Sequence, residues 1–116
     1  MSDDKHVPPK AVQQAAKKGL DWYHDGHGGD GLVQKTIREA QDMARGNALP
    51  LEKIMRMRAW FARHSVDKQS ESWHKGTDSK PSPSQVAWAL WGGDAGRVWA
   101  VSVMRRAEKN KKNSAE

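Results

Sequence analysis

The sequence predicts an all-α protein: a single compact domain of about five short helices, with a long loop between the third and the fourth. Apolar residues recur at spacings of three and four in several segments, which is typical of amphipathic helices. Proline, serine and glycine stand where these segments begin and end. No segment shows the strict alternation of apolar and polar residues that predicts a half-buried strand.

The first two helices are expected from Pro9 to His24 and from Leu32 to Arg45. Leu20 and Ile37 fall on their apolar faces. Four glycines within residues 26–31 separate the two helices, because each glycine costs about 1 kcal/mol relative to alanine in a helix interior. A turned loop is therefore expected between them.

The third helix is expected from Pro50 to His64, with Ile54 and Phe61 in its core-facing stripe. Residues 65–81 show no periodicity and are rich in Asp, Ser, Lys, Gly and Pro. This composition predicts a long surface loop. The loop contains one tryptophan, Trp73.

The fourth helix, from Pro83 to Trp91, has the clearest start in the chain, because Ser82 and Gln85 have the spacing of a capping box. A glycine pair ends it, and Asp94 is expected to cap a fifth helix that runs to about Arg106. The apolar face of the fifth helix is expected at Val98, Val101 and Met104.

A length of 116 residues allows one domain. The polar ends lead us to expect a disordered N-terminus over residues 1–6, a helical domain over 7–107 and a basic disordered tail over 108–116. The expected core combines aliphatic positions of the helices with large aromatic side chains. Its residues are Leu20, Ile37, Ile54, Phe61, Trp88, Trp91 and Trp99.

The composition excludes several classes of protein. The chain has no cysteine, which removes disulfides, thiolate nucleophiles and cysteine-ligated zinc and fits a reducing cytoplasm. No apolar run approaches the roughly 20 residues of a membrane span, and the first residues lack the pattern of a signal peptide. We therefore expect a soluble cytoplasmic protein without a membrane partner.

The formal net charge of +6 favours an anionic partner, and the third helix offers a surface for one. Three cations and one tryptophan are spaced there by three, four and three residues, which places them on a single helix face. Cations interleaved with an aromatic ring suit phosphate contact and base stacking. The alternative is an ordinary solvated face with the tryptophan turned into the core. Together with two tail arginines, the predicted nucleic-acid-binding residues are Lys53, Arg56, Trp60, Arg63, Arg105 and Arg106.

The chain has six tryptophans, which is more than a core of this size hides easily. Tryptophan is also favoured at protein interfaces, because it buries a large apolar area and still offers one hydrogen-bond donor. Trp73 and Trp60 are expected to be exposed enough to contact a protein partner. They carry the protein-interaction hypothesis.

Neither a metal site nor catalysis is predicted. His24, His27 and Asp30 are suitable zinc ligands on one glycine-rich loop, but they lack a second ligand pair at a recognisable spacing, so the sequence leaves metal binding there open. The glycine-rich turn before the fifth helix lacks the Lys-Ser/Thr ending of a nucleotide-binding loop. His64 and Asp67 form the one candidate acid–base pair, without a nucleophile at matching spacing. We predict no cofactor and no enzymatic activity.

Two segments, residues 61–68 (FARHSVDK) and residues 83–100 (PSQVAWALWGGDAGRVWA), resemble a small helical module found in phage and prophage proteins, alone or fused to head-associated proteins. The resemblance covers most of residues 7–107. It implies a phage or prophage context, with the protein in the host cytoplasm or associated with the virion. It implies no chemistry and no functional residues.

Two functions follow as hypotheses. The first is a non-catalytic phage-encoded basic module that binds nucleic acid through the third-helix face and the basic tail. The alternative is a protein-interaction module, acting in virion assembly or in inhibition of a host protein, that uses exposed tryptophans. Steep salt dependence would mark the first function, and dependence on the tryptophans would mark the second.

Overall fold

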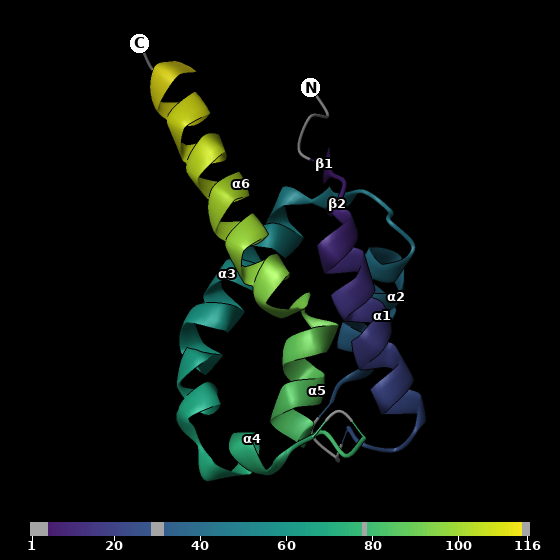
Figure 1. The fold of residues 1–116 in the computed structure, drawn as a ribbon. Helices are drawn as coiled ribbons and strands as arrows, with labels where there is room; N and C mark the ends of the chain where they lie inside the picture. The colour runs from purple at the N-terminus through teal and green to yellow at the C-terminus, as the bar shows by residue number, and fades with distance from the viewer. Residues whose placement is uncertain (1–4, 29–31, 78, 115–116) are drawn as a thin grey trace.

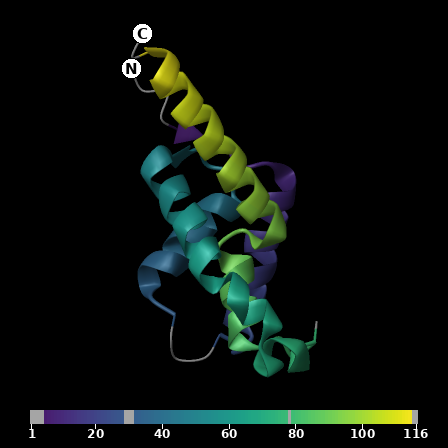
Figure 2. The ribbon, with the colours of Figure 1, turned by 90° about the vertical axis from the view of Figure 1, so that its left-hand side faces the viewer.

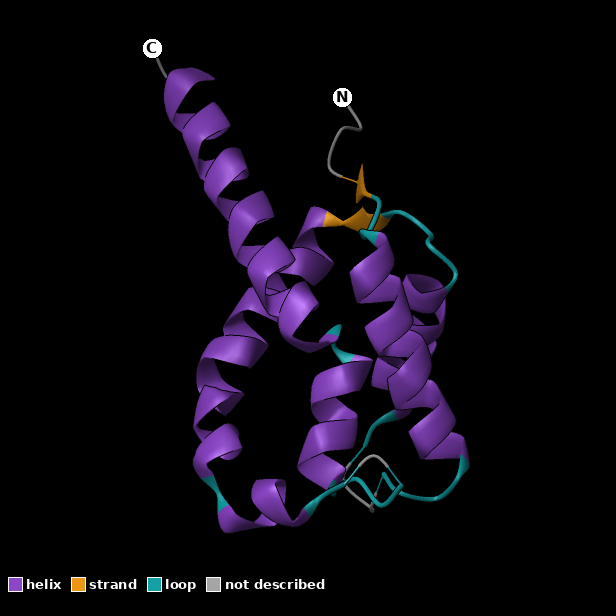
Figure 3. Cartoon of the chain, in the orientation of Figure 1, coloured by secondary structure: helices purple, strands orange, loops and turns teal. Residues whose placement is uncertain are grey.

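A computed structural model describes residues 5–28, 32–77 and 79–114, and in these residues the fold is all-α, as the sequence predicts (Figure 1 and Figure 3). Two short strands, β1 and β2, pair antiparallel, with Lys5 opposite Pro50 and His6 opposite Leu49. The elements in chain order are β1 (Lys5–His6), α1 (Lys10–His24), α2 (Gln34–Ala44), β2 (Leu49–Pro50), α3 (Leu51–His64), the 3-10 helix η1 (Ser65–Gln69), α4 (Glu71–Lys75), α5 (Pro83–Leu90) and α6 (Gly93–Ser114).

The helix starts follow the local signals in the sequence. Pro9 and Pro50 stand directly before α1 and α3 in extended conformations. Before α5, the Ser82 hydroxyl accepts from the Gln85 backbone N–H, and the Gln85 side chain accepts from the Ser82 backbone N–H. Each partner satisfies a donor that the first turn leaves free, so α5 begins at the predicted residue.

The predicted long loop after α3 is wrong over much of its length, because it contains η1 and α4. Ser70 caps α4 by accepting from the Trp73 backbone N–H at 3.2 Å. Ser70 also donates to the Asp67 carbonyl at 2.7 Å, which ties the two short helices together. These elements are only five residues long each, so they carry no apolar periodicity for a sequence pattern to reveal.

Both predicted disordered ends need correction. At the N-terminus, residues 5 and 6 form β1, while residues 1–4 lie outside the described part of the chain. At the C-terminus, α6 continues through the predicted basic tail to Ser114. The composition explains the error, because residues 108–112 are polar yet mostly strong helix formers, without glycine or proline.

The core lies where α1 packs on α2 and α5, and where α3 packs on α6. A Cβ built on Gly19 would lie 2.7 Å from the Leu90 backbone nitrogen, so the absence of a side chain there lets α1 and α5 approach closely. Gly92, with φ of 116°, turns the chain between α5 and α6 in a conformation that side-chain-bearing residues rarely adopt. α6 then leaves the body and projects beyond the other helices in both views (Figure 1 and Figure 2).

Most residues of the expected core are buried, but two tryptophans are only half-buried. Trp91 follows α5 and lies at the edge of the aromatic cluster, and Trp99 borders the buried face of α6. The buried face of α6 is centred on Ala100, Val103 and Met104, which leaves the expected core position Val98 exposed to 59%. The residues that are buried as expected are Leu20, Ile37, Ile54, Phe61 and Trp88.

Candidate nucleic-acid interface

Lys53 does not lie on the surface, which corrects the predicted third-helix face. It is 2% exposed, and its Nζ lies 3.2 Å from Oε1 of Glu39 on α2. The same ammonium lies 3.8 Å from the centroid of the Trp91 ring, a cation–π distance. Lys53 therefore joins α2, α3 and the end of α5 and is not available to a phosphate.

Arg56 remains partly exposed, but its charge is already compensated. Its Nη1 and Nη2 donate to the two carboxylate oxygens of Glu39 at 3.1 and 2.7 Å. Its Nε and Nη2 also donate to Glu52 at 2.7 and 3.0 Å. A guanidinium held by two carboxylates is a structural group of the α2–α3 contact, so the prediction of a free cation here is wrong.

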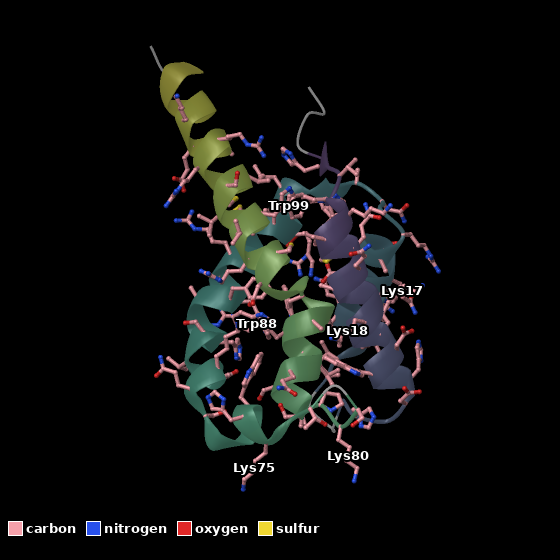
Figure 4. The ribbon with its side chains drawn as sticks, viewed as in Figure 1. Lys17, Lys18, Lys75, Lys80, Trp88 and Trp99 are labelled. Carbon is pink, nitrogen blue, oxygen red and sulfur yellow. The ribbon has the colours of Figure 1, made fainter. Side chains whose placement is uncertain are left out.

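Trp60 and Trp73 are half-buried members of an aromatic cluster. The Trp60 ring stacks on Trp91 with centroids 5.0 Å apart and on His64 at 4.4 Å. Trp73 meets Trp88 edge-on at 5.7 Å. Figure 4 shows Trp88, the centre of the cluster, between α3 and α5. The alternative in which Trp60 turns inward is thus the observed one, and both rings pack against other aromatic side chains.

Of the four residues predicted on the α3 face, Arg63 alone is exposed without an ion pair or hydrogen bond to another described residue. The spacing of three, four and three residues does place the four on one side of the helix, but that side faces α2 and α5. The signal that the sequence lacks is Glu39, which approaches from α2 and has no fixed spacing to α3. A pattern within one helix does not reveal such a partner.

The pKa values of Lys53 and Glu39 are both lowered in the folded protein, but for different reasons. Burial lowers the pKa of Lys53 to about 8, although the attraction of Glu39 acts in the other direction. For Glu39, burial raises the pKa, but hydrogen bonds from Arg56 and the charge of Lys53 outweigh it and hold the pKa below its usual range. One pKa unit corresponds to about 1.36 kcal/mol. Keeping Lys53 charged at neutral pH therefore lowers the free energy of unfolding by about 3 kcal/mol, relative to a lysine with its ordinary pKa.

We expect Lys53→Met to leave the free energy of unfolding at pH 7 unchanged or to raise it by about 1–2 kcal/mol, because a buried ion pair is often no better than apolar packing. The folded pKa of Lys53 lies below the unfolded value, so the wild type gains stability as pH rises from about 8 toward 10.5. The variant lacks this gain, and its advantage shrinks in that window. Urea unfolding at pH 7 and pH 9.5 measures both effects. A loss above about 2 kcal/mol at pH 7 would show that the pair is net stabilising.

Several exposed cations lie on α6. This helix contains six cationic residues and two acidic ones. Both acidic residues are held by partners: Glu108 accepts from Arg58 at 2.9 Å, and Asp94 accepts from Lys68 and from the Trp88 indole N–H. Asp94 lies inside the first turn of α6 and not before it, which corrects its expected capping position. Among described side chains, the exposed cations of this helix are Arg97, Arg105, Arg106 and Lys109.

A shallow groove of about 360 Å³ runs along the outward face of α6. Val98 and Val101 form its apolar part and Ser102 contributes a hydroxyl. Its charged residues are Arg97, Arg105 and Arg106, so the part of the groove that the structure describes has three cations and no carboxylate. This arrangement suits an anionic surface.

A second cavity of about 560 Å³ lies beside the aromatic cluster, with Trp60, Trp91 and His64 in its wall. Asp67 also lines it and lies 3.0 Å from His64 Nδ1. Two residues that line this cavity, Thr36 and Ser84, have hydroxyl side chains. Neither hydroxyl makes a hydrogen bond to the His64 ring in the described residues. The contact with Asp67 orients the His64 imidazole in this wall.

The described residues contain no group of three or more His, Cys, Asp and Glu side chains that would hold a metal ion. His24 and His27 lie at and after the end of α1, and the His24 ring contacts Tyr23 edge-on at 5.5 Å. Asp30, the third residue of the suggested metal set, lies outside the described residues.

Comparisons with known protein families, with curated proteins and with solved structures find no match to this chain. Within the described residues, no helix combines the length and apolar content needed to span a membrane.

Proposed function

We propose that the protein is a non-catalytic module that binds nucleic acid through the basic helix α6. One observation carries this proposal: α6 has six cationic residues against two acidic ones, and both acidic side chains are held by partners. α6 thereby supplies most of the formal net charge of +6. A phage or prophage context is part of the proposal and rests on the sequence resemblance of residues 61–68 and 83–100.

The physical basis is phosphate contact. Each lysine or arginine that neutralises a phosphate releases a condensed counterion, and the logarithm of the affinity falls with the logarithm of salt with a slope of about −0.9 per contact. Arg105, Arg106 and Lys109 are exposed and have no ion pair with a described residue. They can approach phosphates without breaking a contact of the folded protein, whereas Lys53 and Arg56 cannot.

The test is a triple variant, Arg105→Gln, Arg106→Gln and Lys109→Gln, which keeps helix propensity while it removes three charges. We expect the affinity for a short DNA duplex to fall at least about tenfold at low salt, and the salt slope to become less steep by about 3. Fluorescence anisotropy measures both quantities, and circular dichroism checks the fold.

The matched control removes three exposed cations from α1 and α2: Lys17→Gln, Lys35→Gln and Arg38→Gln. Lys17 lies on the outer side of α1 (Figure 4). We expect this control to lose at most about threefold in affinity, because it changes the net charge but not the contact surface. Equal losses in the two triple variants would contradict a site on α6.

A second candidate function, protein interaction, has an observation of its own. Val33 is 61% exposed and lines the cavity that Trp60 and Trp91 also line. Exposed apolar side chains around a cavity favour contact with an apolar anchor of a partner. The variant Val33→Ser would then weaken binding of a protein partner and leave DNA affinity unchanged, which is the reverse of the pattern expected for the α6 variant.

A further inference from the structure

We infer that α6 binds double-stranded DNA, with its outward face in the major groove, in preference to single strands or duplex RNA. This inference rests on the proposed function and names its substrate class. It is carried by the length of α6, by the distribution of charge on its outward face, and by the packing of the tryptophan, tyrosine and phenylalanine rings, none of which is fully exposed in the described residues.

The dimensions of α6 suit a DNA groove. Its 22 residues span about 33 Å at 1.5 Å per residue. Its contacts with the body include buried Met104 and the ion pair between Glu108 and Arg58, and the turns that follow stand clear of the other helices (Figure 2). A helix with side chains is about 10–12 Å across, and the major groove of B-form DNA is about 12 Å wide. The outward face of α6 therefore fits the width of the groove, and the turns after Glu108 extend the helix beyond the body.

The cations of α6 are spread across its outward face, as contact with both walls of a groove requires. At about 100° per residue, Arg97 and Arg106 lie roughly 180° apart around the helix axis. Arg105 and Lys109 lie between them, close to the middle of the outward face, in line with the small residue Ser102. A helix in the major groove has a phosphate wall on each side and base edges at the floor. Arg97 and Arg106 would face the two walls, and the central pair would face the floor.

The aromatic residues argue against single strands. Proteins that bind single-stranded nucleic acid combine a cationic groove with exposed aromatic rings on which the bases stack. All six tryptophans of this chain lie among the described residues, and each is buried or half-buried. The tyrosine is half-buried and the phenylalanine is buried. α6 presents aliphatic, hydroxyl and cationic side chains on its outward face, which contact phosphates and groove edges but do not stack.

The shape of the major groove also distinguishes a DNA duplex from an RNA duplex. The major groove of an A-form RNA duplex is deep and narrow, so a helix does not enter it. Recognition would then depend on the shallow minor groove, which a straight cationic helix contacts over a shorter length. We expect the protein to bind an RNA duplex of equal length less tightly.

The experiment compares one sequence as a DNA duplex, a DNA single strand and an RNA duplex, with the full chain at one low salt concentration. We expect the DNA duplex to bind at least about tenfold more tightly than either alternative. Distamycin, a minor-groove ligand, should not displace the protein. Substituted pyrimidines that fill the major groove should weaken binding at least about tenfold, and the triple variant at Arg105, Arg106 and Lys109 should lose the preference for the duplex.

The outcomes separate the inference from the function. Equal or tighter binding to the single strand or to duplex RNA would overturn the inference and leave nucleic-acid binding standing. Displacement by distamycin would overturn the major-groove placement in the same way. Absence of binding to all three probes at low salt would overturn the proposed function together with the inference.

Discussion

Replacing Trp88 by alanine is expected to lower the free energy of unfolding by about 4–5 kcal/mol, the upper part of the range for emptying a large aromatic site. Trp88 is 5% exposed and contacts three other aromatic rings, those of Trp60, Phe61 and Trp73. Its indole N–H also donates to Asp94 at 2.9 Å, so the substitution leaves that carboxylate with one donor fewer. Urea unfolding followed by circular dichroism measures the loss.

Two further variants test how the loss of stability depends on the ring at position 88 and on its central place in the cluster. Trp88→Phe keeps a ring in the cluster and loses the hydrogen bond to Asp94, so we expect a smaller loss of about 1–3 kcal/mol. Trp91→Ala should cost less than Trp88→Ala, because Trp91 is half-buried at the edge of the cluster. A greater loss for Trp91→Ala would contradict the central position of Trp88 in the aromatic cluster.

Replacing Glu39 by glutamine is expected to cost about 3 kcal/mol at neutral pH, the lower end of the range for breaking a buried ion pair. The substitution leaves the Lys53 ammonium, whose side chain is 3% exposed, without its counter-charge. It also removes the carboxylate that accepts two hydrogen bonds from Arg56. The free energy of unfolding in urea at pH 7 gives the effect.

The pH dependence of the Glu39 variant provides an internal check. The pKa of Glu39 is held below its usual value in the folded protein, so its ionisation contributes stability above the unfolded pKa of 4.5. This contribution is lost as pH falls through the folded pKa. The difference in the free energy of unfolding between the wild type and the Glu39→Gln variant should therefore narrow in that range. The matched control is Glu108→Gln in the exposed pair with Arg58, which should cost less than about 1 kcal/mol. Equal costs for the two variants would contradict a structural role for the buried pair.

Local signals in the sequence predict most of the fold. Pro9, Pro50 and the Ser82–Gln85 capping box mark helix starts because each acts on backbone groups only a few residues away. The short helices η1 and α4 have no such signal beyond Ser70. The C-terminal part of α6 is polar, and polarity alone does not separate an exposed helix from a disordered tail.

The candidate site is harder to predict, because it depends on contacts between helices. Periodicity places Lys53, Arg56 and Trp60 on one face of α3 but does not say which neighbour that face meets. Glu39 on α2 and Trp91 after α5 decide that these residues are structural. Arg105 and Arg106 are exposed, as their predicted role requires, but their arrangement on a helix that continues to Ser114 depends on the polar C-terminal residues, whose helix the sequence did not predict.

The most direct test of the account is an amide-resolved NMR titration with a short DNA duplex at low and at near-physiological salt. We expect chemical-shift changes at the amides of the outward positions of α6, from Arg97 to Lys109, and these changes should weaken steeply as salt rises. The amides of α3 between Lys53 and Arg63 should stay unperturbed, because that face is packed against α2 and α5. Shifts centred on α3, or a spectrum that does not change at low salt, would contradict the assignment of the interface to α6.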